Sequence, residues 1–498
     1  MFKPTTLKRV AMAVACAAGL GVAGSASAAN WLMLQGTEHP KKKGQRLFAF
    51  IQPAYSKSTG DKLEGLVAPG SGGTLLPSNG LYAVPNTVTP DFNETSQVYL
   101  RRARLGSRGT FTGAFANSFT AKMNYFFLLA LDDGLFNQNQ FSGDRNPVTV
   151  DHASVTFNHI PGARIRAGLF KNPISEEIFQ AVNTIDFIEF TTFGAQHVLE
   201  NFYSGNANTV GSNAGAGFSN AVGTPDRHAY GFSAARDWGI QVFDSFKVAN
   251  KSWDLSYAVK IGRGEAIRQG SDTDDNKELY LYASAEKNLP GGRGPRKNGI
   301  KYYAWLQDGK RQFTSDSTDE EFDRRRYGIG VKGLGKFFGS KYKQRFAAEL
   351  AYAEGMIFNG PSGGAARGDA TAGPGVVNFA TDDDNKARGV QLEYGFYLNK
   401  NWQFDVRWAQ QDRLYERSDE INPGAERKFT ETTLGATYHF TKKARMTFNY
   451  TFRDVDVPND YDTSTGVGAG GVTDIQNNAD IVTDSIGDRI GLQLTYIF

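Results

Sequence analysis

Apolar and polar residues alternate one by one along much of the chain, most clearly in its last stretch, 486–498. One parity carries polar residues or glycine. The other parity is apolar: Ile486, Ile490, Leu492, Leu494, Tyr496 and Phe498. Because a β-strand turns successive side chains to opposite faces, this pattern predicts a strand with one apolar face and one wet face.

The same period of two recurs in roughly sixteen segments, which predicts an all-β protein. An example is 402–408, where tryptophan, phenylalanine and valine alternate with glutamine, aspartate and arginine. The predicted strands are 46–56, 96–109, 116–131, 147–159, 163–171, 236–247, 251–262, 277–288, 298–308, 322–336, 343–355, 386–398, 401–413, 429–440, 444–454 and 486–498.

Alternation is compatible with both a soluble β-sandwich and a membrane β-barrel, and the lengths of the connections distinguish the two. Every second connection is short, and the ones between are long, with 172–228 the longest. A soluble sandwich has no reason to sort its loops in this way. A membrane barrel does, because its periplasmic turns are short and its extracellular loops are long. The sequence therefore predicts a transmembrane antiparallel up-and-down β-barrel of about 16 strands.

Hydropathy and the N-terminus agree with this prediction. Mean hydropathy is −0.43, and after the first residues no apolar run approaches the ~18 residues of a membrane helix. Lys3, Lys8 and Arg9 precede a short apolar run that ends at the small residues 26–28, which is typical of a signal peptide. We predict a signal peptide at 1–28, a periplasmic N-terminal arm at 29–45 and an outer-membrane barrel at 46–498 in a Gram-negative bacterium.

Net charge does not point to a partner, but the placement of charge does. The chain has 55 Lys and Arg against 52 Asp and Glu, and removing the signal peptide leaves 52 of each. On the wet parity, basic residues outnumber acidic ones, which predicts a positive lumen that selects anions; the alternative is salt-bridged packing inside the barrel. The predicted basic set is Arg102, Arg104, Lys122, Arg164, Arg166, Lys260, Arg326, Lys332, Arg407, Arg445, Arg453 and Arg489, of which Arg489 is assigned to the periplasmic half.

The longest connection, 172–228, is the third on the extracellular side. Pro173 stops the strand, and Glu176 and Glu177 begin a short helix that carries apolar residues. An external loop would not leave so much apolar surface in water. We therefore expect the loop to fold into the pore, with Asp186 and Glu189 pairing with lumen arginines; a subunit contact or an extracellular flap is the alternative.

Three motifs carry a resemblance to a known family: 100–106 (LRRARLG), 168–173 (GLFKNP) followed by Ser175-Glu176-Glu177, and 236–241 (RDWGIQ). In this order, and together with the terminal strand, they resemble the phosphate-selective porins O and P. The resemblance implies a sixteen-stranded homotrimeric anion channel whose second strand supplies constriction arginines at Arg101 and Arg102. It makes phosphate or polyphosphate the expected solute; a general, organic-acid or carbohydrate porin, or a structural barrel without channel activity, remains an alternative.

Arg101 conflicts with the simple alternation, because its parity points toward lipid, where a charge costs ~2–4 kcal/mol. Either a bulge turns it inward beside Arg102, or it lies in a subunit interface. The residues predicted to bind anions or line the pore are Arg101, Arg102, Arg104, Arg164, Arg166, Arg407 and Arg445.

The sequence offers no catalytic template. No H-E-x-x-H or G-x-S-x-G motif occurs, and the one cysteine, Cys16, lies in the predicted signal peptide. His197 and Glu200 share a loop, but a metal site there is the weaker interpretation. We predict neither enzyme activity nor a cofactor, and as partners the lipid bilayer, lipopolysaccharide, small anionic solutes and copies of the chain, without nucleic acid.

Overall fold

The computed structural model describes residues 30–34, 45–61, 65–67, 75–77, 96–111, 116–131, 148–198, 201–204, 228–231, 235–264, 276–291, 297–312, 321–356, 358–359, 379–380, 385–413, 415, 426–456, 484 and 486–498. The predicted signal peptide lies outside the described residues. None of the described helices is long and apolar enough to cross a membrane.

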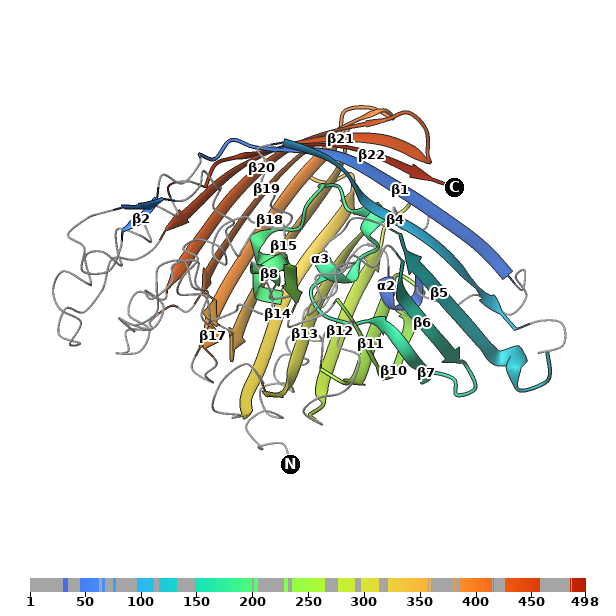
Figure 1. Ribbon diagram of the computed structural model, residues 1–498. Coiled ribbons are helices and arrows are strands. Elements are labelled where there is room, and N and C mark those ends of the chain that lie inside the picture. Colours follow the sequence, from blue (N-terminus) through green and yellow to red (C-terminus); the bar gives the residue numbers. More distant parts are fainter. Residues whose placement is uncertain are drawn as a thin grey trace.

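Sixteen antiparallel strands close into one barrel (Figure 1). Each strand pairs with its neighbours in sequence order, and β1 closes the ring by pairing with β22. The barrel strands are β1 (Gln45–Ser58), β4 (Ser96–Thr110), β5 (Met123–Ala130), β6 (Thr149–Phe157), β7 (Arg164–Lys171), β10 (Arg236–Val248), β11 (Trp253–Gly262), β12 (Glu278–Asn288), β13 (Gly299–Gln312), β14 (Glu321–Gly335), β15 (Lys343–Glu354), β18 (Ala387–Tyr397), β19 (Trp402–Arg413), β20 (Arg427–His439), β21 (Ala444–Asp456) and β22 (Arg489–Ile497). The predicted barrel is thus confirmed.

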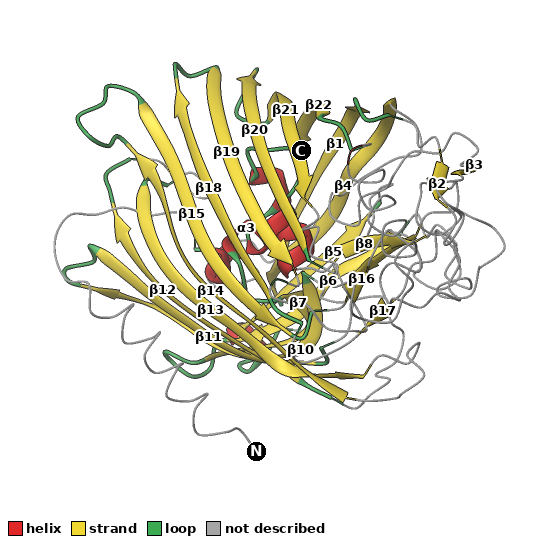
Figure 2. Cartoon of the chain, turned by 90° about the vertical axis from the view of Figure 1, so that its left-hand side faces the viewer, coloured by secondary structure: helices red, strands yellow, loops and turns green. Residues whose placement is uncertain are grey.

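Shorter elements lie in the connections. In the described parts of these connections, three small hairpins pair β2 (Gly65–Val67) with β3 (Leu75–Pro77), β8 (Asn201–Ser204) with β9 (His228–Gly231), and β16 (Phe358–Asn359) with β17 (Phe379–Ala380). The helical elements are α2 (Trp31–Leu34), η2 (Thr120–Lys122), α3 (Glu176–Phe179), η4 (Val182–Thr184) and η5 (Phe193–Val198). Figure 2 shows helical segments inside the ring of strands.

The two faces of the barrel wall are inverted relative to a soluble protein. On β22 the polar side chains of Gln493 and Thr495 are buried inside, while Leu492 and Leu494 are about 40% exposed on the outer face. The other strands show the same inversion, with Leu47, Ile240, Ile329 and Leu350 among the exposed residues. An apolar exterior around a closed, fully hydrogen-bonded wall is what a bilayer requires of a β-structure.

The third predicted strand is wrong at its start. It was expected from residue 116, but β5 begins at Met123. The Asn117 side chain accepts hydrogen bonds from the backbone N–H groups of Phe119 and Thr120, which stabilises a turn in place of the strand. As a consequence Lys122 lies in η2 and is exposed, rather than facing the lumen.

The two ends of the barrel differ in their connections. Short turns join β6 to β7, β10 to β11, β18 to β19 and β20 to β21, and we call this end the turn end. The opposite end is the loop end. In bacterial barrels the turn end faces the periplasm. Arg489 pairs with Ser58, the last residue of β1, and so lies at the loop end. Its assignment to the periplasmic half is wrong, because the last strand runs from the long connection back toward the turns.

Candidate functional site

The loop that follows β7 crosses the interior of the barrel (Figures 1 and 2). Pro173 interrupts the pairing with β10 that ends at Lys171. Beyond it the loop buries a row of apolar side chains against the inward-facing Phe243, Tyr282 and Trp305. Each such side chain contributes ~1.5–3 kcal/mol when fully buried, which offsets part of the entropic cost of ordering the loop. The row is Ile174, Ile178, Phe179, Ile185, Phe187, Phe190 and Phe193.

Polar wall residues hold the backbone of this loop. Arg445 on β21 donates from Nη2 to the carbonyl oxygens of Asn183 (3.1 Å) and Ile185 (2.6 Å). Asn449, further along the same face, accepts a 2.8 Å hydrogen bond from the N–H of Ile188. Arg407 on β19 donates from Nη1 to the carbonyl of Glu189 at 2.9 Å. Two of the arginines predicted to bind anions, Arg407 and Arg445, therefore anchor the loop.

The two glutamates of α3 occupy different electrostatic environments. Glu176 accepts hydrogen bonds from Tyr282 (2.5 Å), Lys301 (2.9 Å) and Lys332 (3.0 Å). Glu177 accepts from both the N–H and the hydroxyl of Thr191, while Arg407 lies 3.4 Å away. Both carboxylates are buried and fix the loop to the wall or to itself.

These environments shift the pKa values of the two glutamates in opposite directions. Burial alone would raise the pKa of Glu176, but Lys301 and Lys332 hold it at about 2. Burial raises the pKa of Glu177 to about 7 against the pull of Arg407 and the Thr191 hydrogen bonds. Near neutral pH, Glu176 is therefore ionised and Glu177 is partly protonated.

A pH dependence of stability follows from Glu177. Between the ordinary value of 4.5 and about 7, the folded protein retains a proton that the unfolded chain has released. Raising the pH through this window should therefore lower the free energy of unfolding by about 3 kcal/mol. We expect Glu177→Gln to lose this dependence, as measured by the midpoint of heat unfolding in detergent at about pH 5 and about pH 8.

The neighbouring Glu176→Gln is the matched control. A lowered pKa stabilises above the ordinary value of 4.5, so this contribution is fully present at both pH values. Glu176→Gln should therefore lower the midpoint equally at both. A wild-type midpoint that falls no more steeply with pH than that of Glu177→Gln would contradict the assignment.

A bulge turns Arg101 into the barrel. Gln52 of β1 pairs with Arg102 and Pro53 pairs with Leu100, so Arg101 is the extra residue on β4. Its guanidinium is 3% exposed and makes a two-pronged contact with Glu189 of the loop, from Nε at 3.0 Å and Nη2 at 2.6 Å. Of the two expected placements, the structure adopts the inward one. The loop also pairs through Asp186, which lies 3.4 Å from Arg345.

A second bulge places an acid that alternation did not reveal. Leu128 of β5 pairs with His152 and Leu129 pairs with Val150, which leaves Asp151 as the extra residue on β6. Its carboxylate lies 3.0 Å from Nε of Arg104 and 3.0 Å from Nη1 of Arg236. Asp151 thus bridges two arginines.

Together these residues form a basic cluster on one side of the lumen. Lys171 lies within electrostatic range of Arg102, Arg104, Arg236 and Asp151. Nη2 of Arg102 and Nε of Arg236 have no hydrogen-bond partner among the described residues. Such buried donors are normally satisfied by water or an anion. The basic cluster is Arg101, Arg102, Arg104, Lys171 and Arg236, with Asp151 and Glu189 as its two carboxylates.

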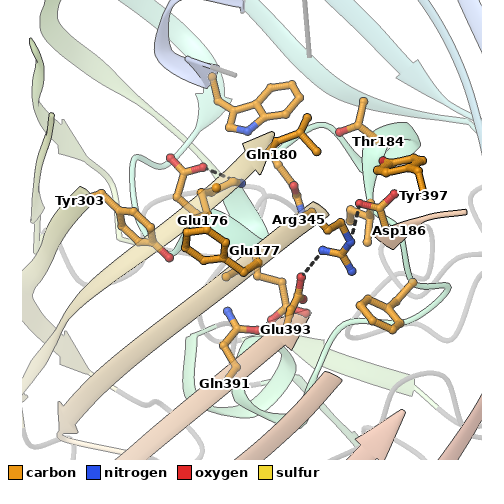
Figure 3. A pocket seen from close by; sticks show the side chains of 18 residues that line it. Glu176, Glu177, Gln180, Thr184, Asp186, Tyr303, Arg345, Gln391, Glu393 and Tyr397 are labelled. Carbon is orange, nitrogen blue, oxygen red and sulfur yellow. Dashed lines mark hydrogen bonds and ion pairs between the residues drawn. The ribbon is translucent and has the colours of Figure 1, made fainter. Parts of the chain in front are cut away.

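The opposite side of the lumen is acidic. Arg345 on β15 is surrounded by Asp405 (2.6 Å), Glu393 (2.7 Å) and Asp186 (3.4 Å). Figure 3 shows Arg345 between Asp186 and Glu393. These residues line a cavity of about 90 Å³ between the loop and strands β14, β15 and β18. In the ring order β15 lies nearly opposite β4. A solute between the loop and the wall therefore experiences an electric field directed from the basic side of the lumen to the acidic side.

The remaining predicted arginines lie elsewhere. Arg166 donates from Nη2 to the carbonyl of Leu32 at 3.2 Å, and Arg164 lies 3.6 Å from Asp244. Neither joins the basic cluster. His197 is fully buried and stacks on Phe193, and Glu200 lies outside the described residues. Among the described residues no group of three or more His, Cys, Asp or Glu side chains could hold a metal ion.

Lys171, Arg236, Asp151 and Arg345 were not singled out from the sequence. Arg345 shares the wet parity of Glu349, so alternation would have found it. Lys171 is the last residue of β7, and Arg236 is the first residue of β10. The two residues are paired across the neighbouring strands. Both belong to motifs that were quoted without a role for these residues. Asp151 had no such signal, because the bulge reverses its parity.

No family model and no curated protein matches the chain. Among solved structures it is similar to OprB of Pseudomonas putida, with 9% identity and a TM-score of 0.49 over 96% of this chain and 100% of that one. It is similar to the outer membrane channel DcaP of Acinetobacter baumannii, with 13% identity and a TM-score of 0.46 over 91% and 97%. It is also similar to the anion-selective porin from Comamonas acidovorans, with 12% identity and a TM-score of 0.43 over 91% and 99%.

The location of the protein in the cell follows from the structure of its barrel wall. A closed barrel that is apolar outside and polar inside is the form in which β-structure crosses the bacterial outer membrane. The protein is therefore located in the outer membrane of a Gram-negative bacterium.

Proposed function

We propose that the protein is a passive diffusion channel that favours small anions. The observation that carries this proposal is the basic cluster, in which five basic side chains face two carboxylates beside the loop. A charged wall at a narrow, low-dielectric point raises the local concentration of counter-ions. The excess of positive charge therefore favours anions where the loop narrows the lumen.

The chemistry of the cluster fits oxyanions. Guanidinium groups offer paired N–H donors that match phosphate and carboxylate oxygens. Asp151 and Glu189 occupy part of that donor capacity, which keeps binding weak enough for the anion to leave. We propose phosphate or polyphosphate as the solute, in line with the family resemblance, and a homotrimer as the assembly.

The test is the reversal potential of single channels in a planar bilayer across a potassium chloride gradient, with phosphate titrated into both chambers. We expect a potential of the sign set by chloride and a current that phosphate reduces at low concentration. A cation-selective sign would overturn anion preference. An effect of sugars or organic acids but not of phosphate would identify a different solute. The absence of current steps would point to a structural barrel.

A further inference from the structure

A short N-terminal segment also lies inside the barrel. Residues 30–34 were expected in a periplasmic arm, but they pack against the inner wall. The side-chain amide of Asn30 donates to the hydroxyls of Ser245 (3.1 Å) and Ser256 (2.8 Å) on β10 and β11. Arg166 on β7 donates to the carbonyl of Leu32 at 3.2 Å. We call residues 30–34 the inner plug.

The inner plug and the loop share one apolar cluster. Leu32 is fully buried and Trp31 is 5% exposed. Both belong to the cluster that contains Ile178 and Phe179 of α3 and Ala258 of the wall. Trp31 also lines the cavity beside Glu176 and Arg345. Beside β10 to β13 the lumen is therefore occupied by apolar side chains of the plug, the loop and the wall.

The sequence explains why the segment is inside. Trp31–Leu34 reads WLML, four large apolar residues in a row. A helix of this length has no stability of its own in water, so its contacts must hold it in place. Leaving these side chains in the periplasm would expose an apolar patch. Packing Trp31 and Leu32 on the apolar side of the loop removes both problems.

We propose that the inner plug is a positioning element of the constriction. It closes the lumen on the β10–β13 side and supports the inner face of the loop, so that solutes pass along the basic cluster near β4. This inference rests on the proposed channel function. The selectivity of the pore then depends on residues that do not touch the permeating anion.

The first experiment compares Leu32→Asp with Leu32→Met in single-channel recordings. A carboxylate is expelled from an apolar cluster, whereas methionine conserves volume and shape. We expect Leu32→Asp to raise conductance about twofold, because the open cross-section widens, and to weaken anion preference, because the new path does not run along the basic cluster. Leu32→Met should behave as wild type in both measurements.

A second measurement follows the position of the plug directly. The only cysteine of the sequence is Cys16 in the predicted signal peptide, so a single new cysteine can be labelled cleanly. Ala258, 1% exposed, belongs to the same apolar cluster as Trp31 and Leu32. We expect a polar thiol reagent to label Ala258→Cys slowly with Leu32→Met and at least about tenfold faster with Leu32→Asp.

The outcomes separate the two proposals. Faster labelling together with higher conductance supports the plug. Faster labelling with unchanged conductance overturns its role in the constriction, and unchanged labelling overturns its packing by Leu32. A heat-modifiable band on unboiled gels shows that each variant has folded. If the wild type gave no current steps, the proposed channel function would be wrong, and the proposed role of the plug in the constriction would be wrong with it. The labelling experiment would still test whether Leu32 packs the plug against the wall.

Discussion

Replacing Arg102 and Arg104 together by glutamate should abolish the anion preference of the channel and reverse it at low salt. The exchange changes the basic cluster from five positive and two negative groups to three positive and four negative. The sign of the local field therefore inverts. We expect the anion-to-cation permeability ratio to fall about tenfold or more, which corresponds to ~1.4 kcal/mol in ion binding.

The measurement is the reversal potential at about 0.1 M and about 1 M salt, since the Debye length shrinks from ~10 Å to ~3 Å between them. The effect should be smaller at the higher concentration. Lys442→Glu with Lys443→Glu is the matched control. It makes the same change in charge on exposed residues of the turn between β20 and β21. Because the carboxylate introduced by Arg104→Glu would face Asp151, Arg102→Gln serves as a milder second variant.

Two results would contradict the assignment. An unchanged reversal potential in a folded double variant would move the selectivity filter away from the basic cluster. An equal shift in the turn control would mean that total charge, rather than its position at the loop, determines selectivity. The weaker Arg102→Gln variant should lower anion preference without reversing it.

The barrel could be predicted from the sequence because its signal is local. The alternation of apolar and polar residues shows which side chains of a strand face outward and which face the lumen. The length of a connection shows at which end of the barrel it lies. All sixteen predicted segments correspond to barrel strands. The largest error, at 116–122, arose where an asparagine side chain stabilises a turn inside a stretch that continues the alternation.

The site could be predicted only in part, because bulges and long-range contacts leave no local pattern. One inserted residue reverses parity, so the facing of Arg101 stayed open and Asp151 was missed. The inward parity of Arg407 and Arg445 was visible, but their partners are backbone carbonyls of the loop, more than two hundred residues away in sequence. An arginine that binds a loop carbonyl and one that binds an anion have the same pattern in the strand.

Lumen arginines can thus either hold the loop or bind an anion. The second prediction therefore concerns the residues that hold the loop. Arg445 and Asn449 lie on the same face of β21 and contact the loop backbone at Asn183, Ile185 and Ile188. Removing both side chains in Arg445→Ala/Asn449→Ala loses three hydrogen bonds, two of them from a charged donor. Together these contribute about 3 kcal/mol, which changes the equilibrium between held and released loop about a hundredfold.

We expect the double variant to show a higher mean conductance and frequent transitions between current levels, since the released loop moves in and out of the lumen. Thr447→Ala is the matched control. Thr447 lies between the two anchors on the same face, but its hydroxyl bonds to Thr437 of the neighbouring strand. It should leave the current steady. If the double variant conducted like Thr447→Ala, the apolar row and the remaining polar contacts would be sufficient to hold the loop. The role of these wall residues in narrowing the pore would then be wrong, whatever the selectivity of the basic cluster.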